Sequence, residues 1–201
     1  MSNKSNSDFS DERRLVSGLK KGQEEAFRVL IRRYEKKLFS IAYGITLDRE
    51  ESLDIVQEVF LKVYQKIHTF REEARLSTWL HRITVNLCLN WQRRWNRRFR
   101  WHHQPLERDG AGDHRELGTN DYHPQTLCER KECGKILWEG LRALSEEARA
   151  VFVLKEVEGL SYDDIGEILK IKRGTVSSRL FYARKALRAS LEPYLEEGKN
   201  S

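Results

Sequence analysis

The chain has 201 residues, with 39% hydrophobic and 34% charged side chains, a composition that predicts a folded but strongly solvated protein. No apolar stretch is long enough to cross a bilayer, and the polar N-terminus lacks a signal-peptide pattern, so we expect a cytoplasmic protein without membrane insertion. The three cysteines fit reduced thiols rather than a disulfide framework.

The formal charge of +6 is unevenly distributed along the chain. Residues 71–101 carry eight arginines against two glutamates, and residues 170–188 carry seven lysines and arginines with no acid. Two separated cationic segments on an otherwise balanced chain indicate two contacts with a polyanion such as nucleic acid.

Helical periodicity runs through the first hundred residues and predicts helices near 11–19, 24–44, 49–67 and 76–100. The helix near 49–67 has a stripe that we expect to be buried: Leu53, Val56, Phe60, Val63 and Ile67. A second stripe on another face combines acids with an outward leucine: Asp54, Glu58, Leu61 and Gln65. This second stripe is either a docking surface for a partner helix or an ordinary solvated face.

The helix near 76–100 also has two faces. Its apolar stripe consists of Leu76, Leu80, Ile83, Leu87 and Trp91. A neighbouring face collects aromatic, amide and arginine side chains: Trp79, Arg82, Asn86, Asn90, Arg93 and Arg97. Stacking contributes about 1–3 kcal/mol per base and cations bind phosphates, so this face suits single-stranded nucleic acid. Trp79 can instead belong to the core.

Residues 102–125 lose the apolar period and collect Gly, Pro, Asp and His, which predicts a flexible linker. Further helices are expected up to about 144 and near 146–158, 161–170 and 174–191. The predicted class is therefore all-α, with two small helical domains joined by the linker. The expected divisions are a frayed N-terminus at 1–14, domains at 15–102 and 134–192, the linker at 103–133 and a tail at 193–201.

Residues 160–188 predict a helix-turn-helix. Ser161 and Asp164 resemble a capping arrangement, the period breaks around 171–174, and a second helix follows. Its expected buried stripe is Val176, Leu180, Ala183 and Leu187. The opposite side presents Ser178, Phe181, Tyr182 and Lys185, flanked by Arg179 and Arg184. Such a face suits a DNA major groove, although an ordinary helical hairpin can also carry a solvated face.

Three segments carry a family resemblance: LDIVQEVFLKVYQKIHTF at 53–70, STWLHRITVNLCLNW at 77–91, and VFVLKEVEGLSYDDIGEILKIKRGTVSSRLFYARKAL at 151–187. With them, the sequence resembles the extracytoplasmic-function (ECF) group of bacterial sigma-70-type factors over about 15–102 and 134–192. The resemblance implies a region 2 bundle, a region 4 helix-turn-helix and promoter-specific initiation with RNA polymerase core. It also implies that DNA melting draws on binding energy, with no catalytic residue, cofactor or metal.

The resemblance assigns roles to three sets of residues. Polymerase binding is implied for Asp54, Gln57, Glu58 and Leu61. The loop from Phe70 to Leu76, with Asn86, is implied to accept a flipped non-template base near −10. DNA binding at the −10 element is implied for Phe70, Thr78, Trp79, Arg82, Asn86, Arg93 and Arg97. Recognition of the −35 element is implied for Arg173, Thr175, Ser177, Ser178, Arg179, Phe181, Tyr182 and Lys185. The expected partners are the clamp helices and flap of the polymerase core, duplex and melted promoter DNA, and an anti-sigma protein, with the factor itself monomeric.

Two other classes of function can be weighed against this one. An enzyme is disfavoured because the sequence has no Walker loop, HExxH or G-x-S-x-G motif. A zinc site would have to use scattered side chains: His102, His103, His114, His123, Cys128 and Cys133. A stand-alone helix-turn-helix regulator is the closer alternative, since the C-terminal segment alone would support it.

Overall fold

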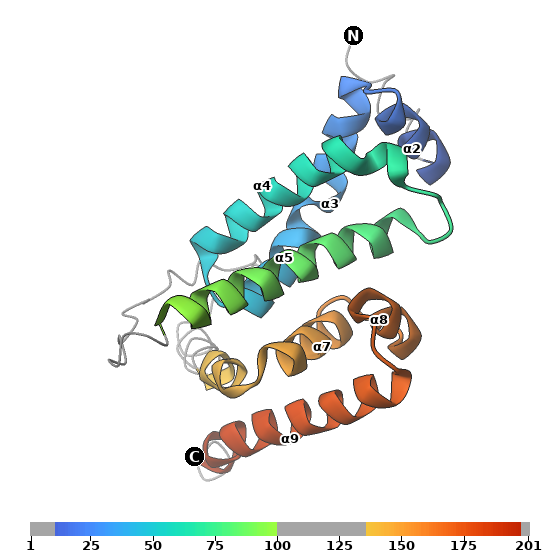
Figure 1. Ribbon diagram of the computed structural model, residues 1–201. Coiled ribbons are helices and arrows are strands. Elements are labelled where there is room, and N and C mark those ends of the chain that lie inside the picture. The colour runs from blue at the N-terminus through green and yellow to red at the C-terminus, as the bar shows by residue number, and fades with distance from the viewer. Residues whose placement is uncertain (1–10, 100–135, 198–201) are drawn as a thin grey trace, which may run out of the picture.

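The computed structural model describes residues 11–99 and 136–197, and every regular element within these ranges is helical (Figure 1), as the sequence predicts. The elements are α2 (Glu12–Lys20), α3 (Glu24–Thr46), α4 (Arg49–Lys66), the 3-10 helix η1 (Ile67–Thr69), α5 (Leu76–Phe99), α7 (Glu146–Glu156), α8 (Tyr162–Leu169) and α9 (Arg173–Glu197). Residues 136–143 are also helical.

No helix within the described ranges is both long and apolar enough to span a membrane.

Side-chain caps explain why several helices begin where they do. Asp11 accepts a hydrogen bond from the Arg13 amide at the start of α2, and Asp48 accepts one from Glu51 at the start of α4, both at 3.1 Å. Each cap satisfies a backbone donor that the first helical turn leaves without a partner. Helix α2 begins at Glu12, which agrees with the helix predicted near 11–19, so residues 12–14 are helical although the expected divisions placed them in a frayed N-terminus.

Helices α2 to α5 form an N-terminal bundle with α3 packed against both α4 and α5. Leu30, Leu38, Ile41, Ile45 and Leu80 are completely buried in its core. The prediction for Leu53 was wrong. Its side chain is 41% exposed, because the face of α4 that meets α3 and α5 centres on Ile55 and Val59 instead.

The C-terminal helices make the predicted helix-turn-helix. A capping box between Ser161 and Asp164 starts α8, and Lys170 ends it in the left-handed conformation, at φ +55°. A Cβ at Gly166 would lie 2.9 Å from the Ile171 carbonyl oxygen, so the close turn requires glycine at this position. Helix α9 continues past Pro193 to Glu197, later than predicted.

The two groups of helices pack against each other. Helix α7 contacts α3 and α5, and α8 contacts α5, so that α7 and α8 lie along one side of the N-terminal bundle (Figure 1). Gly44 of α3 and Val153 of α7 meet so closely that a Cβ at position 44 would lie 2.8 Å from a Val153 methyl group. One continuous buried cluster runs through both halves. The predicted linker at 103–133 lies outside the described residues.

Candidate nucleic-acid interface

Helix α9 presents a polar, aromatic and cationic face to solvent. The predicted buried stripe is confirmed, with Val176, Leu180, Ala183 and Leu187 all buried. On the opposite side, Phe181 and Tyr182 are 63% and 66% exposed, and their rings meet edge to face at 5.5 Å. Ser177, Ser178 and Lys185 are exposed beside them, whereas Thr175 and Arg179 are half-buried. The sequence therefore placed this face correctly.

Two arginines next to this face bond to neighbouring helices. Arg184 donates to Glu156 of α7 through Nε at 3.0 Å and Nη2 at 2.6 Å, and this hydrogen-bonded carboxylate raises the pKa of Arg184. Arg173 donates to Asp163 of α8 at 3.3 Å in a well-exposed pair. Exposed ion pairs contribute little free energy, so the Arg173 guanidinium can exchange its carboxylate for a phosphate oxygen.

A pocket of about 200 Å³ lies where the loop after η1 meets α5. Phe70 is buried, and its ring lies 5.2 Å from that of half-buried Trp79. Thr78 and Arg82 line the same pocket. An aromatic floor beside a hydroxyl and a guanidinium offers stacking, hydrogen bonding and charge to an unstacked base.

The remainder of the α5 face continues away from this pocket. Asn86, Arg93 and Arg97 are exposed, as the sequence predicts. Arg93 donates to the Asn90 side chain at 3.2 Å, and Arg97 donates to the Arg93 carbonyl at 3.3 Å. This arrangement aligns the guanidinium groups along one edge of the helix, where a phosphate backbone can follow them.

Carboxylates of α8 border the same pocket. Glu167 lines it, and Asp164 and Glu167 line an adjoining pocket with Thr78 and Glu72. The C-terminal helices therefore approach the proposed reading surface of the N-terminal bundle with negative charge. The sequence did not predict this proximity, because nothing in a local pattern specifies how two modules dock.

The outer face of α4 combines acidic and apolar groups. Asp54 and Gln57 are exposed, Leu61 is 55% exposed, and half-exposed Glu58 pairs with Lys62 at 3.1 Å. Sequence reasoning missed Tyr64, which is 65% exposed and extends the apolar part of this face. Its i, i+3 spacing from Leu61 is the signal that could have revealed it.

No group of three or more metal-binding side chains occurs within residues 11–99 and 136–197. The histidines and cysteines weighed as a zinc site, from His102 to Cys133, lie outside the described residues. Cys88 is free and buried, and burial raises its pKa to about 12, so its thiol stays protonated and poorly reactive.

Comparison with known proteins identifies the family. Residues 30–99 match the family model for sigma-70 region 2, and residues 135–187 match that for sigma-70 region 4. The chain is 33% identical over 185 residues to the ECF RNA polymerase sigma-E factor of Haemophilus influenzae, covering 90% of this chain and 95% of the relative. It is 31% identical over 192 residues to the RNA polymerase sigma-H factor of Pseudomonas aeruginosa, covering 92% and 96%.

Two solved structures share the fold. CnrH in complex with the cytosolic domain of CnrY aligns with a TM-score of 0.64 and 20% identity, covering 90% of this chain and 97% of that one. The sigma factor RpoE of Bartonella quintana, in complex with the anti-sigma factor NepR, aligns with a TM-score of 0.66 and 22% identity, covering 83% and 96%.

The chain therefore belongs to the sigma-70 family, within its ECF group, and is an RNA polymerase sigma factor. Sigma factors are DNA-binding initiation factors without a reaction of their own, so the expectation of a non-enzymatic protein is confirmed by family membership. RNA polymerase and promoter DNA follow as partners from the same membership.

Proposed function

We propose that this sigma factor binds polymerase core through the outer face of α4, reads the −10 element with the α5 pocket and reads the −35 element with α9. The observation that carries the proposal is the separation of three exposed faces on one chain. The face on α4 is acidic and apolar, and the face on α9 is aromatic and cationic. The face on α5 carries exposed amide and cationic side chains and adjoins the pocket at half-buried Trp79.

Helix α9 has the shape and chemistry for the −35 element. A helix is about 10–12 Å wide with its side chains, which matches the width of about 12 Å of a major groove. Phe181 can contact a thymine methyl, while Lys185 and Arg179 can bind guanine or phosphate. The other residues expected to read the −35 element lie beside these contacts in the N-terminal half of the same helix: Arg173, Thr175, Ser177, Ser178 and Tyr182.

The pocket at Phe70 and Trp79 suits one unstacked base of the melted non-template strand. Extruding a base costs a few kcal/mol, and stacking on an aromatic ring with nearby cations offsets this cost. Thr78 and Arg82 are placed to bond to the base or its phosphate, and Asn86, Arg93 and Arg97 extend the contact along α5. Melting on this proposal requires no nucleotide hydrolysis.

The α4 face suits the clamp helices of the polymerase core, with the C-terminal module reaching the flap. Leu61 and Tyr64 offer apolar area, and Asp54 and Glu58 offer charge complementary to a basic helix. Gln57 adds a neutral hydrogen-bonding group among them.

We further propose a monomer that acts on DNA in the cytoplasm and is held inactive by an anti-sigma protein. The structural relative RpoE of Bartonella quintana was solved in complex with the anti-sigma factor NepR, which supports the last point.

Charge reversal tests the polymerase contact. Asp54→Lys combined with Glu58→Lys should weaken association with core, while binding of a −35 duplex should be unchanged. Glu35→Lys combined with Glu139→Lys changes the net charge equally at two exposed sites elsewhere and serves as the control. Fluorescence titration against core polymerase and against duplex DNA separates these outcomes. Equal weakening by both pairs would contradict the assignment of α4.

A further inference from the structure

The loop between η1 and α5 is held in a conformation that its own sequence disfavours. Glu72 has φ +61°, in the left-handed region that costs a non-glycine residue about 1–2 kcal/mol. Arg75, just before α5, has no acceptor atom on its side chain and cannot cap the helix. The local sequence therefore does not explain the conformation of residues 70–75, and contacts from elsewhere in the chain must hold this loop.

Helix α2 supplies two such contacts. Glu12 Oε1 accepts a hydrogen bond of 2.8 Å from the Leu76 amide, the first amide of α5, across 64 residues of sequence. A carboxylate at this position also interacts favourably with the positive end of the α5 dipole. Lys20 Nζ bonds to Glu72 Oε1, also at 2.8 Å.

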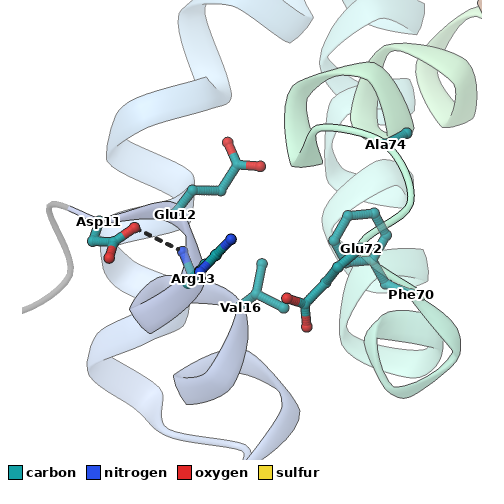
Figure 2. Close-up of a pocket in the computed structure, with 7 residues that line it drawn as sticks. All are labelled: Asp11, Glu12, Arg13, Val16, Phe70, Glu72 and Ala74. Carbon is teal, nitrogen blue, oxygen red and sulfur yellow. Dashed lines mark hydrogen bonds between the residues drawn. The ribbon is translucent and has the colours of Figure 1, made fainter.

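Helix α2 is itself firmly anchored. Leu15, Val16 and Leu19 are at most 1% exposed, and α2 packs against α3 and η1. Figure 2 shows Glu12 and Val16 of α2 on one side of a shallow pocket, facing Phe70 and Glu72 on the other, with the Glu72 carboxylate extending toward α2. The loop and α2 therefore pack together next to Phe70, which also lines the proposed −10 pocket.

We propose that α2 is a clamp that preorganises the −10 recognition loop, and that Glu12 and Lys20 are its positioning residues. This inference rests on the proposed −10 function of Phe70 and Trp79. Neither clamp residue needs to touch DNA. By holding residues 70–75 in place before binding, the clamp removes the ordering cost that a free loop incurs when it receives a flipped base.

The two contacts contribute unequally. Glu12 bonds to a partly buried amide, so its loss leaves that amide without its cap. Lys20 and Glu72 are 32% and 46% exposed, and such pairs are weak and screened by salt. We therefore expect a loss of about tenfold in −10 affinity for Glu12→Ala, and a loss of about twofold to threefold, confined to low salt, for Lys20→Glu.

The test measures holoenzyme binding to a fluorescent non-template oligonucleotide that spans the −10 element of a promoter selected from a random library. Glu12→Ala should bind about tenfold more weakly. Glu12→Gln, which keeps an acceptor oxygen, should recover most of this loss. Lys20→Glu and Glu72→Lys should each weaken binding at low salt, and the double exchange should restore it. Glu24→Ala, which removes a first-turn glutamate of α3 bonded to Arg28, is the matched control and should bind like wild type.

Core association and −35 duplex binding should stay unchanged in all clamp variants, and hydrogen exchange of the Leu76 amide should accelerate in Glu12→Ala. One result overturns the clamp: Glu12→Ala, Lys20→Glu and Glu72→Lys each bind the −10 oligonucleotide within twofold of wild type, while Phe70→Ala and Trp79→Ala bind it poorly. It is also overturned if Glu12→Ala loses all three binding activities together, because that result indicates a general effect on folding. If Phe70→Ala and Trp79→Ala also bind like wild type, the −10 proposal fails, and the clamp fails with it.

Discussion

His81 and Glu158 form a buried titratable pair where the two modules meet. His81 of α5 is 4% exposed, and its Nε2 lies 4.0 Å from a Glu158 carboxylate oxygen in the segment after α7. Neither ring nitrogen has a hydrogen-bond partner among the described residues. Burial, with a smaller effect of Lys37, lowers the pKa of His81 to about 4, and burial raises the pKa of Glu158.

These shifts predict how stability depends on pH. The unfolded chain binds a proton at His81 below about pH 6.5, whereas the folded chain resists it down to about pH 4. The stability that neutral His81 confers is therefore present above pH 6.5 and lost as the pH falls toward 4, by about 2 kcal/mol at pH 5. Glu158 acts in the opposite direction, since its raised pKa favours folding at low pH.

Urea unfolding of wild type and His81→Gln at pH 7 and pH 5 isolates the His81 contribution, because Glu158 is present in both proteins. From pH 7 to pH 5, the free energy of unfolding of the wild type should fall by about 2 kcal/mol more than that of the variant. Equal losses would show that His81 is not held neutral at the module interface.

Lys185 and Arg184 are adjacent cations with different expected roles. Lys185 lies on the exposed face of α9, whereas Arg184 bonds to Glu156. Lys185→Ala should weaken binding to the −35 duplex by about 1–3 kcal/mol, and Arg184→Ala should change it by less than about 1 kcal/mol. Fluorescence anisotropy at fixed salt measures both. A larger effect of Arg184→Ala would mean that DNA approaches the other side of α9.

At the scale of the element, sequence periodicity predicted every major helix of the described ranges. Apolar side chains recur at helical spacing, and caps such as Asp48 and Ser161 are visible as residue types. The stripe Val176 to Leu187 and the outward position of Phe181 follow from that spacing alone. Leu53 was misplaced because α4 packs against two helices at once, which turns its buried centre toward Ile55 and Val59.

Contacts between elements distant in sequence were beyond such reasoning. The bond from the Leu76 amide to Glu12, the packing of Val153 on Gly44 and the position of Glu167 beside the −10 pocket each join separate helices. Periodicity reports which face of a helix is buried but not which helix covers it. For the same reason, assignment of the α4 and α5 faces to partners depended on family resemblance.

Two glycines of the helix-turn-helix give a matched test of the turn. A Cβ at Gly166 would lie 2.9 Å from the Ile171 carbonyl oxygen, whereas one at Gly174 would have nothing within 4 Å. Gly166→Ala should therefore destabilise the protein by about 1–3 kcal/mol and weaken −35 binding, despite alanine's higher helix propensity. Gly174→Ala should be neutral or stabilising by up to about 1 kcal/mol. Thermal unfolding distinguishes them, and similar effects of the two substitutions would contradict the account of the turn.

At the scale of the whole molecule, the packed arrangement is too short to reach both promoter elements at once if α5 reads −10 and α9 reads −35, as proposed. Elements at −10 and −35 lie about 25 base pairs apart, or about 85 Å along straight duplex at about 3.4 Å per base pair. Helix α5 has 24 residues and spans about 36 Å, and α8 contacts it directly. We therefore expect the modules to separate when both elements are bound, which also removes the α8 carboxylates from the −10 pocket.

A bulky side chain at the contact between α3 and α7 should separate the two modules even without DNA. Gly44→Leu places a side chain where Val153 packs, so small-angle scattering should show a larger radius of gyration with helical content retained. The Gly44→Leu protein should also bind −10 single strand more tightly than wild type, because Glu167 no longer borders the pocket.

A smaller substitution supplies the control for Gly44→Leu. Gly44→Ala should open the protein partially, and adding Val153→Ala should restore the packed form by removing the conflicting methyl groups. An unchanged radius of gyration in Gly44→Leu would mean that these helices do not hold the modules together.

Transcription from a promoter library with purified core polymerase, followed by sequencing of the start sites, tests most directly whether this chain selects promoters with two separate faces. We expect discrete start sites preceded by one element near −10 and another near −35. Trp79→Ala should relax selection only at the first element, and Lys185→Ala only at the second. Failure of the wild-type chain to associate with core polymerase and to direct any defined start would contradict the account.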